Sequence, residues 1–93
     1  MRYEVIKTKR FKTAYKRVSQ LPGFKKTTFG KAVRTLAEGK SLEAKYRDHS
    51  LKGKLASFRE CHLAPDILLL YQVDDGLLIL SLVSIGNHGQ LFK

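Results

Sequence analysis

The sequence RECHLAPDILLLY, residues 59–71, carries the clearest structural signal in the chain. Its second part, residues 67–71, is an uninterrupted apolar run of the kind found in a buried central strand. Its first part is polar and holds Arg59, His62 and Asp66 close to the start of that strand, with a proline that breaks the backbone between them. Such side chains at a strand edge suit a catalytic groove, and they also occur at ordinary strand ends.

The segments on either side of this stretch predict a single α+β domain over residues 1–93. A β-branched N-terminal segment predicts a short strand at a sheet edge, and two segments with apolar residues at helical spacing, separated by Pro-Gly, predict a helical hairpin. Asp-Asp-Gly between two apolar runs is typical of a β-hairpin. We therefore expect a mainly antiparallel sheet that ends in a three-stranded meander, with the helices on one face. We expect a strand over 3–8 and helices over 9–21 and 24–38, followed by a loop over 40–50. A strand can start at 51–53, and further strands are expected over 57–63, 67–73 and 77–83. A loop over 84–87 and a terminal turn over 88–92 complete the chain.

Positive charge is concentrated in the first half of the chain. Overall 18 Lys and Arg residues stand against 8 Asp and Glu residues, for a net charge of +10. Residues 1–47 hold 14 basic and 3 acidic residues, whereas residues 48–93 hold 4 basic and 5 acidic ones. A polycationic half favours a polyanionic partner such as nucleic acid, and the alternative is a solvated basic surface that keeps the protein soluble.

Composition also narrows the class of protein. No apolar run reaches the length of a membrane span, and the N-terminus lacks a secretory apolar segment, so we expect a cytoplasmic protein without membrane contact. The only cysteine, Cys61, excludes an internal disulfide framework. The pair Cys61-His62 raises the alternative of a zinc site. Neighbouring strand residues point to opposite faces and no Cys-x-x-Cys pair exists, so we expect no metal and no other cofactor.

Three histidines, His49, His62 and His88, are the strongest candidates for chemistry. Imidazole titrates near neutral pH, so a site that both removes and donates a proton can use two of them. With a basic half beside it, such a groove fits RNA cleavage without a metal, in which a base activates a ribose 2′-hydroxyl and an acid protonates the leaving 5′-oxygen. The alternative is that each histidine is an ordinary surface residue.

Three motifs together resemble the YafQ branch of the RelE-like toxins, the toxin halves of bacterial type II toxin–antitoxin pairs. They are DHSLKG at 48–53, FRECHLAPDILLLY at 58–71 and IGNHGQLF at 85–92. The resemblance implies a RelE-like α+β fold and a ribosome-dependent endoribonuclease that cuts translated mRNA. It also implies a cognate antitoxin, acidic and of a DNA-binding type, that forms a hetero-oligomer with the toxin.

The resemblance also assigns roles within the site. His49, His62 and His88 fall on the family's active-site histidines, Asp66 on its active-site acid, and Phe92 on the aromatic residue that helps to hold the substrate base. From the residues alone, the alternative is that Phe92 packs in the core and that Asp66 caps a turn.

Two departures from the family pattern bear on activity. Many relatives carry an arginine two residues before the glycine of the last motif, where this chain has Ser84, and many carry Trp where it has Ile67. Lys52, Lys54 and Arg59 are nearby cations that can take the place of the arginine, and with Phe92 they form the expected RNA-binding set. The alternative function is a catalytically weak or inactive protein of this fold that binds nucleic acid or a partner chain.

Overall fold

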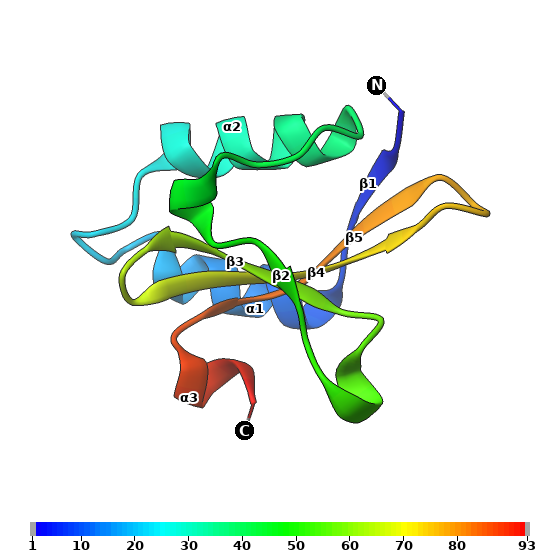
Figure 1. Cartoon of the computed structure of the whole chain (residues 1–93). Coiled ribbons are helices and arrows are strands. Elements are labelled where there is room, and N and C mark those ends of the chain that lie inside the picture. Colours follow the sequence, from blue (N-terminus) through cyan, green and yellow to red (C-terminus); the bar gives the residue numbers. More distant parts are fainter. Residues whose placement is uncertain (1, 93) are drawn as a thin grey trace.

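A twisted five-stranded sheet forms the centre of the molecule (Figure 1). The structure is a computed structural model, and it describes residues 2–92. The strands are β1 (Glu4–Lys7), β2 (His49–Ser50), β3 (Arg59–Ala64), β4 (Ile67–Asp74) and β5 (Ile79–Gly86). The helices are α1 (Lys9–Val18), α2 (Lys26–Ala37) and the short α3 (His88–Leu91), and the 3₁₀ turns are η1 (Ala44–Tyr46) and η2 (Gly53–Leu55).

The strand order is β1-β5-β4-β3-β2, which makes β1 and β2 the two edges of the sheet. Strands β2 to β5 pair antiparallel, and β1 pairs parallel with β5. A parallel pair needs a long crossover connection. Helices α1 and α2 lie in the connection that carries the chain from β1 to the rest of the sheet. The expected α+β class, edge strand and antiparallel meander are confirmed.

Helices α1 and α2 pack on one face of the sheet. The Thr8 hydroxyl accepts the backbone N–H of Phe11 at 3.0 Å, which caps α1, and donates to the carbonyl of Val83 at 2.8 Å. One residue therefore both starts the helix and ties it to β5. Rings from both helices and their connection then interlock, with Tyr15 and Phe24 edge to face at 5.5 Å between centroids.

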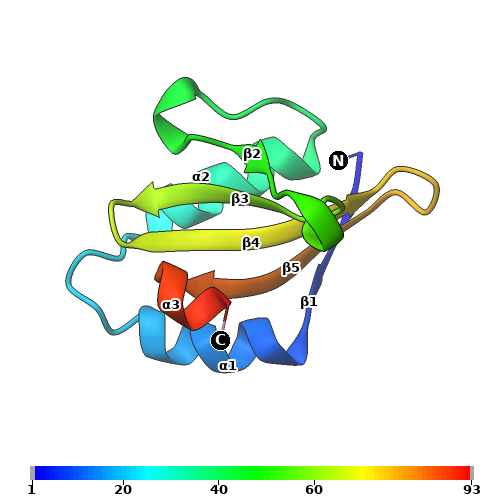
Figure 2. The same cartoon turned by 60° about the horizontal axis from the view of Figure 1, so that its bottom comes forward.

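The opposite face of the sheet is covered only in part. Leu69 and Tyr71 of β4 belong to the large core under α1 and α2, whereas Leu68 and Leu70 form a small second cluster with Leu91 of α3. Figure 2 shows α3 in front of β5, with α2 behind the sheet and α1 along the lower side of the view, below β5. Strand β4 is thus buried on both sides, as its continuous apolar run predicts.

Two connections differ from the sequence-based expectation. The expected loop at 84–87 is the end of β5, which runs to Gly86, and the expected loop at 40–50 contains η1 and β2. The pairing residues at this edge are His49 and Ser50 rather than residues 51–53. Strand β2 has only two residues and no apolar alternation, so its existence depends on β3, which is distant from it in sequence.

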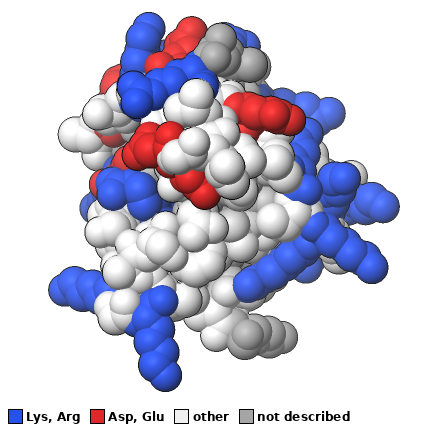
Figure 3. Space-filling model, turned by 90° about the vertical axis from the view of Figure 1, so that its right-hand side faces the viewer, with Lys and Arg blue, Asp and Glu red and all other residues white. Residues whose placement is uncertain are grey.

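Acidic side chains gather at the end of the molecule that carries the β4–β5 turn. Figure 3 views this end and shows the acidic groups in its upper half, with Lys and Arg side chains projecting around the rim. The turn itself contributes Asp74 and Asp75, both exposed. Within residues 2–92, no helix has the length and apolar character needed to cross a membrane.

Candidate active site

Sheet register places two of the histidines on the face that α3 partly covers. His49 of β2 pairs directly with Glu60 of β3, and His62 lies two residues further along β3. Directly paired residues and residues two apart on a strand project from the same face. His62 in turn pairs with Leu68, which belongs to the cluster under α3. The residue after β5 begins the turn that leads to the third histidine, His88.

Glu60 lies at the centre of this site. It is 2% exposed, and its Oε1 is 3.0 Å from Nε2 of His49 and 3.6 Å from Nε2 of His88. Its other oxygen, Oε2, has no hydrogen-bond partner within the described residues. Buried polar groups are normally satisfied, and burial of an unpaired charge is costly, so an incompletely satisfied carboxyl is a functional candidate. The two imidazoles that face it are themselves largely exposed.

Both ring nitrogens of His49 have a partner. Its Nδ1 is 2.6 Å from the carbonyl oxygen of Arg47. A carbonyl oxygen can only accept, so Nδ1 donates in this hydrogen bond. Its Nε2 lies 3.0 Å from Glu60 Oε1, and the two groups form an ion pair when the imidazole is protonated.

Helix α3 positions His88. Asn87 caps it through a reciprocal pair of bonds: its side chain accepts the N–H of Gln90 at 2.9 Å, and the Gln90 side chain accepts the N–H of Asn87 at 3.0 Å. Gly86 permits this approach, because its φ is +152° and a Cβ there would lie 2.6 Å from Gln90 Oε1. The Phe92 ring, 41% exposed, lies 5.5 Å from the His88 ring between centroids.

A polar cluster on the helix-covered face fixes the edge strand from behind. The Arg59 guanidinium donates to both carboxylate oxygens of Asp48 at 3.3–3.4 Å, and the Tyr71 hydroxyl donates to Asp48 as well. Burial alone would lower the pKa of Arg59, but its hydrogen bonds to Tyr71 and Asp48 outweigh this and raise that pKa. Burial, with the Asp48 hydrogen bond, raises the pKa of Tyr71. These residues neighbour or pair with His49 and Glu60, so they hold β2 in register.

The remaining expected residues are placed less centrally. Arg59, expected to bind RNA, lies on the opposite face from the histidines and is bound to Asp48. Asp66 is exposed in the β3–β4 turn and makes no side-chain hydrogen bond or ion pair within residues 2–92. Lys52 and Lys54 are exposed at η2. Cys61 is fully buried in the core under the helices.

Ser84 lines a surface depression that is separate from the histidine face. It is 3% exposed and pairs with Leu70. The depression, of about 450 Å³, is also lined by Arg10 and Arg17 of α1. Two arginines therefore line the depression at the position where many relatives were expected to carry one, and the guanidinium of Arg10 donates to the carbonyl oxygen of Leu91.

Sequence reasoning missed Glu60. Strand alternation carries the signal that would have found it, because an acid two residues from a histidine on one strand shares its face. Within the described residues, no group of three or more His, Cys, Asp or Glu side chains is arranged to hold a metal ion.

Comparison with known proteins identifies relatives of the chain. A sequence model described as a bacterial toxin of type II toxin–antitoxin systems, YafQ, matches residues 3–93. The mRNA interferase toxin YafQ of Escherichia coli K12 is 39% identical over 51 residues, which are 55% of this chain and 53% of that protein. The match thus spans about half the length of this curated relative.

Solved structures extend the likeness to the whole fold. A metal-bound toxin from Helicobacter pylori is 41% identical and superposes with a TM-score of 0.88 over 97% of this chain and 99% of that chain. The toxin in the E. coli DinJ–YafQ complex is 23% identical, with a TM-score of 0.84 over 98% of this chain and 99% of that chain. The second likeness supports the fold alone.

Proposed function

Because the chain belongs to the YafQ family of bacterial toxins of type II toxin–antitoxin systems, we propose that it is an endoribonuclease that cleaves translated mRNA on the ribosome and so inhibits translation. The observation that carries this proposal is the buried Glu60 carboxyl facing His49 and His88 on an open face of the sheet. Three groups that exchange protons, close to solvent and within reach of a polymer strand, suit phosphodiester chemistry.

The reaction begins at the ribose 2′-hydroxyl next to the cleaved linkage. A base removes its proton, the 2′-oxygen attacks the adjacent phosphorus, and the bond from phosphorus to the 5′-oxygen breaks as an acid protonates that oxygen. The products are a 2′,3′-cyclic phosphate and a 5′-hydroxyl end. Positive charge near the phosphoryl oxygens stabilises the transition state.

We infer a division of these roles from the contacts of the histidines. Both ring nitrogens of His49 are engaged, Nδ1 by the Arg47 carbonyl and Nε2 by Glu60, which leaves it poorly placed to act as base. Its position beside Glu60 suits it to donate a proton, or to stabilise negative charge. The base is then His62 or His88, whose rings are available to a substrate on the same face.

The other expected residues act in binding. Phe92, half-exposed beside His88, stacks on a substrate base. Lys52 and Lys54 at η2 contact phosphates, and Asp66 at the β3–β4 turn orients the strand or a histidine. The basic α1 and α2 dock on ribosomal RNA, because phosphate contacts position a protein without specifying sequence.

A cognate antitoxin is the second proposed partner. The E. coli relative was solved in complex with DinJ. A chain with net charge +10 complements an acidic antitoxin segment that folds as it binds, and we propose a toxin–antitoxin hetero-oligomer in the cytoplasm. Its binding would weaken steeply with salt.

We propose a mechanism in which no step requires a metal. The H. pylori relative was solved with metal bound. Among residues 2–92 of this chain, no group of three or more His, Cys, Asp or Glu side chains is arranged to hold an ion. Each proton transfer is carried by the chain's own imidazole and carboxyl groups.

The second candidate function is a non-catalytic binder of the same fold, and Ser84 favours it, because a serine cannot supply the cation expected at that position. Arg10 and Arg17, which line the same depression, offset this in favour of the enzyme.

Cell-free translation of a defined mRNA, followed by primer extension, tests the enzymatic proposal. Wild-type protein is expected to produce new 5′ ends within the translated region, and none on the same mRNA without ribosomes. The His88→Ala variant is expected to lose most of this cleavage and to keep its affinity for the antitoxin. Intact mRNA with wild-type protein, while translation proceeds, would favour the binder.

A further inference from the structure

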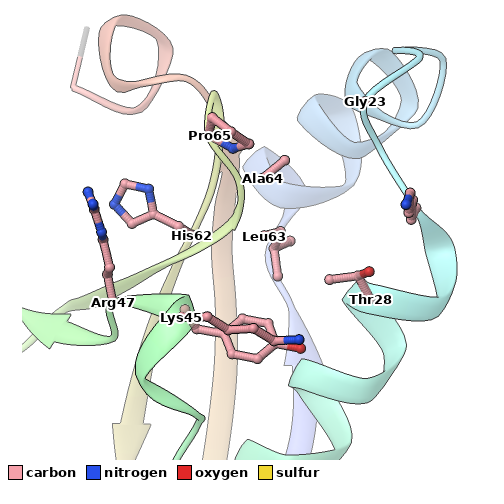
Figure 4. Close-up of a pocket in the computed structure, with 10 residues that line it drawn as sticks. Gly23, Thr28, Lys45, Arg47, His62, Leu63, Ala64 and Pro65 are labelled. Carbon is pink, nitrogen blue, oxygen red and sulfur yellow. The ribbon is translucent and has the colours of Figure 1, made fainter.

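A second hollow lies beside the histidine face, between the start of α2, η1 and the β3–β4 turn (Figure 4). Its volume is about 640 Å³, within the range of about 300–1,000 Å³ typical of ligand sites. Lys25, Lys45, Arg47 and His62 contribute to its lining. None of these residues belongs to the ion pairs that surround Glu60 or Asp48.

The Lys and Arg side chains that line the hollow make it positive. Its lining includes three cations and no Asp or Glu. Within the described residues none of Lys25, Lys45 and Arg47 forms an ion pair, and the Lys45 ammonium lies 5.4 Å from the centre of the Tyr46 ring. Helix α2 also begins here without a side-chain cap, so its first-turn N–H groups add to the same potential. Unneutralised cations around a concave surface favour an anion.

Arg47 joins this hollow to the active site. Its carbonyl accepts the hydrogen bond from His49 Nδ1, and its side chain lies next to that of His62 (Figure 4). Arg47 has a left-handed backbone with φ of +49°, which costs a non-glycine residue about 1 kcal/mol or more.

We propose that this hollow binds a backbone phosphate of the RNA strand that carries the scissile linkage, through Lys25, Lys45 and Arg47. The inference rests on the proposed function for the identity of the strand. His62 then lies between the reacting phosphate, near Glu60, and the phosphate held in the hollow. The strand runs from the histidine face around the β3–β4 turn toward the start of α2.

Binding of a cleavage-resistant RNA tests the inference without any turnover. The probe is a single-stranded oligonucleotide of about ten nucleotides with every 2′-hydroxyl methylated. The variant Lys25→Gln/Lys45→Gln removes two cations from the hollow, and the matched control Lys7→Gln/Lys40→Gln removes two exposed cations from β1 and from the loop after α2. Each lost phosphate contact lowers the slope of log K against log salt by about 0.7 for a single strand.

The hollow variant is expected to lose about 0.7 from the magnitude of this slope, because it loses one phosphate contact, and the control variant to keep the wild-type slope. Equal losses in both variants, or no loss in the hollow variant, would overturn the inference. Loss of ribosome binding with an unchanged oligonucleotide slope would assign the hollow to ribosomal RNA and would overturn it too.

Arg47→Gly provides an independent variant, because glycine accepts the left-handed backbone while the guanidinium is removed. We expect an unchanged or higher thermal midpoint and a slope smaller by up to about 0.7, since Arg47 shares one phosphate with Lys25 and Lys45. A wild-type slope in this variant would contradict the role of Arg47. Failure of mRNA cleavage by the wild type would reject the proposed function and leave these binding results standing. Normal mRNA cleavage by wild-type protein, with no slope change in the hollow variants, would support the proposed function and reject the phosphate site.

Discussion

Glu60 is the residue on which the account depends. A carboxyl group that is 2% exposed, with one oxygen unsatisfied among the described residues, does not help a fold unless its proton or charge is compensated. His49 supplies that compensation at 3.0 Å from an edge strand of only two residues. The site therefore joins a buried carboxyl to an imidazole that is exposed at the edge of the sheet.

We expect Glu60→Gln to slow mRNA cleavage by about 10²-fold or more, because glutamine keeps the shape but holds neither the charge nor the transferable proton. The variant should be at least as stable as wild type, since a buried charge is removed. Single-turnover cleavage rates and thermal unfolding give the two readouts. Glu38→Gln, at an exposed ion pair with Lys40, is the matched control. An unchanged rate in Glu60→Gln would remove this residue from the mechanism.

Cys61 predicts a pH dependence of stability. Burial raises the pKa of its thiol from 9.0 to about 12. The unfolded chain ionises first, so the stability that the neutral thiol contributes is complete below pH 9 and is lost between pH 9 and about 12. Denaturant unfolding of wild type should weaken more steeply over that range than unfolding of Cys61→Ala. Parallel curves for the two proteins would show that the thiol does not set this dependence.

The sequence identified the three histidines as candidate site residues but not Glu60, the carboxyl that two of them face. His49, His62 and His88 were candidates because imidazole titrates near neutral pH wherever it lies. Glu60 was missed because its importance comes from burial and from its pairing with His49, which lies on a strand too short to show a pattern. Arg59 was expected to bind RNA. Its position on the same strand as His62 could not reveal that its side chain faces Asp48 and Tyr71.

At the scale of elements, α3 determines where His88 lies. The helix has four residues, too few to be stable alone, and depends on the reciprocal bonds between Asn87 and Gln90 and on Leu91 packing against the sheet.

Asn87→Ala should therefore displace His88 from Glu60. Loss of the cap costs about 1 kcal/mol, most of it local to α3. We expect a marked fall in kcat, a thermal midpoint within a few degrees of wild type, and a change in the His88 imidazole resonance in NMR spectra. Asn87→Ser, which retains a capping oxygen, should recover part of the rate. Full activity in the alanine variant would show that α3 holds His88 by other contacts.

Elements with local signals were predicted well. The amphipathic helices, the apolar β4 and the β4–β5 turn follow from spacing and turn chemistry, so the meander and the helical hairpin are confirmed. The parallel pairing of β1, the extension of β5 to Gly86 and the existence of β2 depend on contacts between distant segments. No window of local sequence contains that information.

At the scale of the molecule, α1 and α2 pack on one face of the sheet, and α3 covers only part of the other face (Figure 2). The basic first half supplies both helices and η1, while the second half supplies the strands that carry His62 and Glu60 and the helix that carries His88. One part of the chain is thus suited to hold a polyanion and the other to react with it.

The central claim is that this face uses a ribose 2′-hydroxyl to cut mRNA on the ribosome. Its most direct test is single-turnover cleavage on programmed ribosomes, with either an all-ribose mRNA or the same mRNA carrying one 2′-deoxynucleotide at the cut position. The account predicts that wild-type protein cuts the first, leaving a 5′-hydroxyl end, and does not cut the second at that position. Equal cleavage of both, or no cleavage of the all-ribose mRNA, would contradict it.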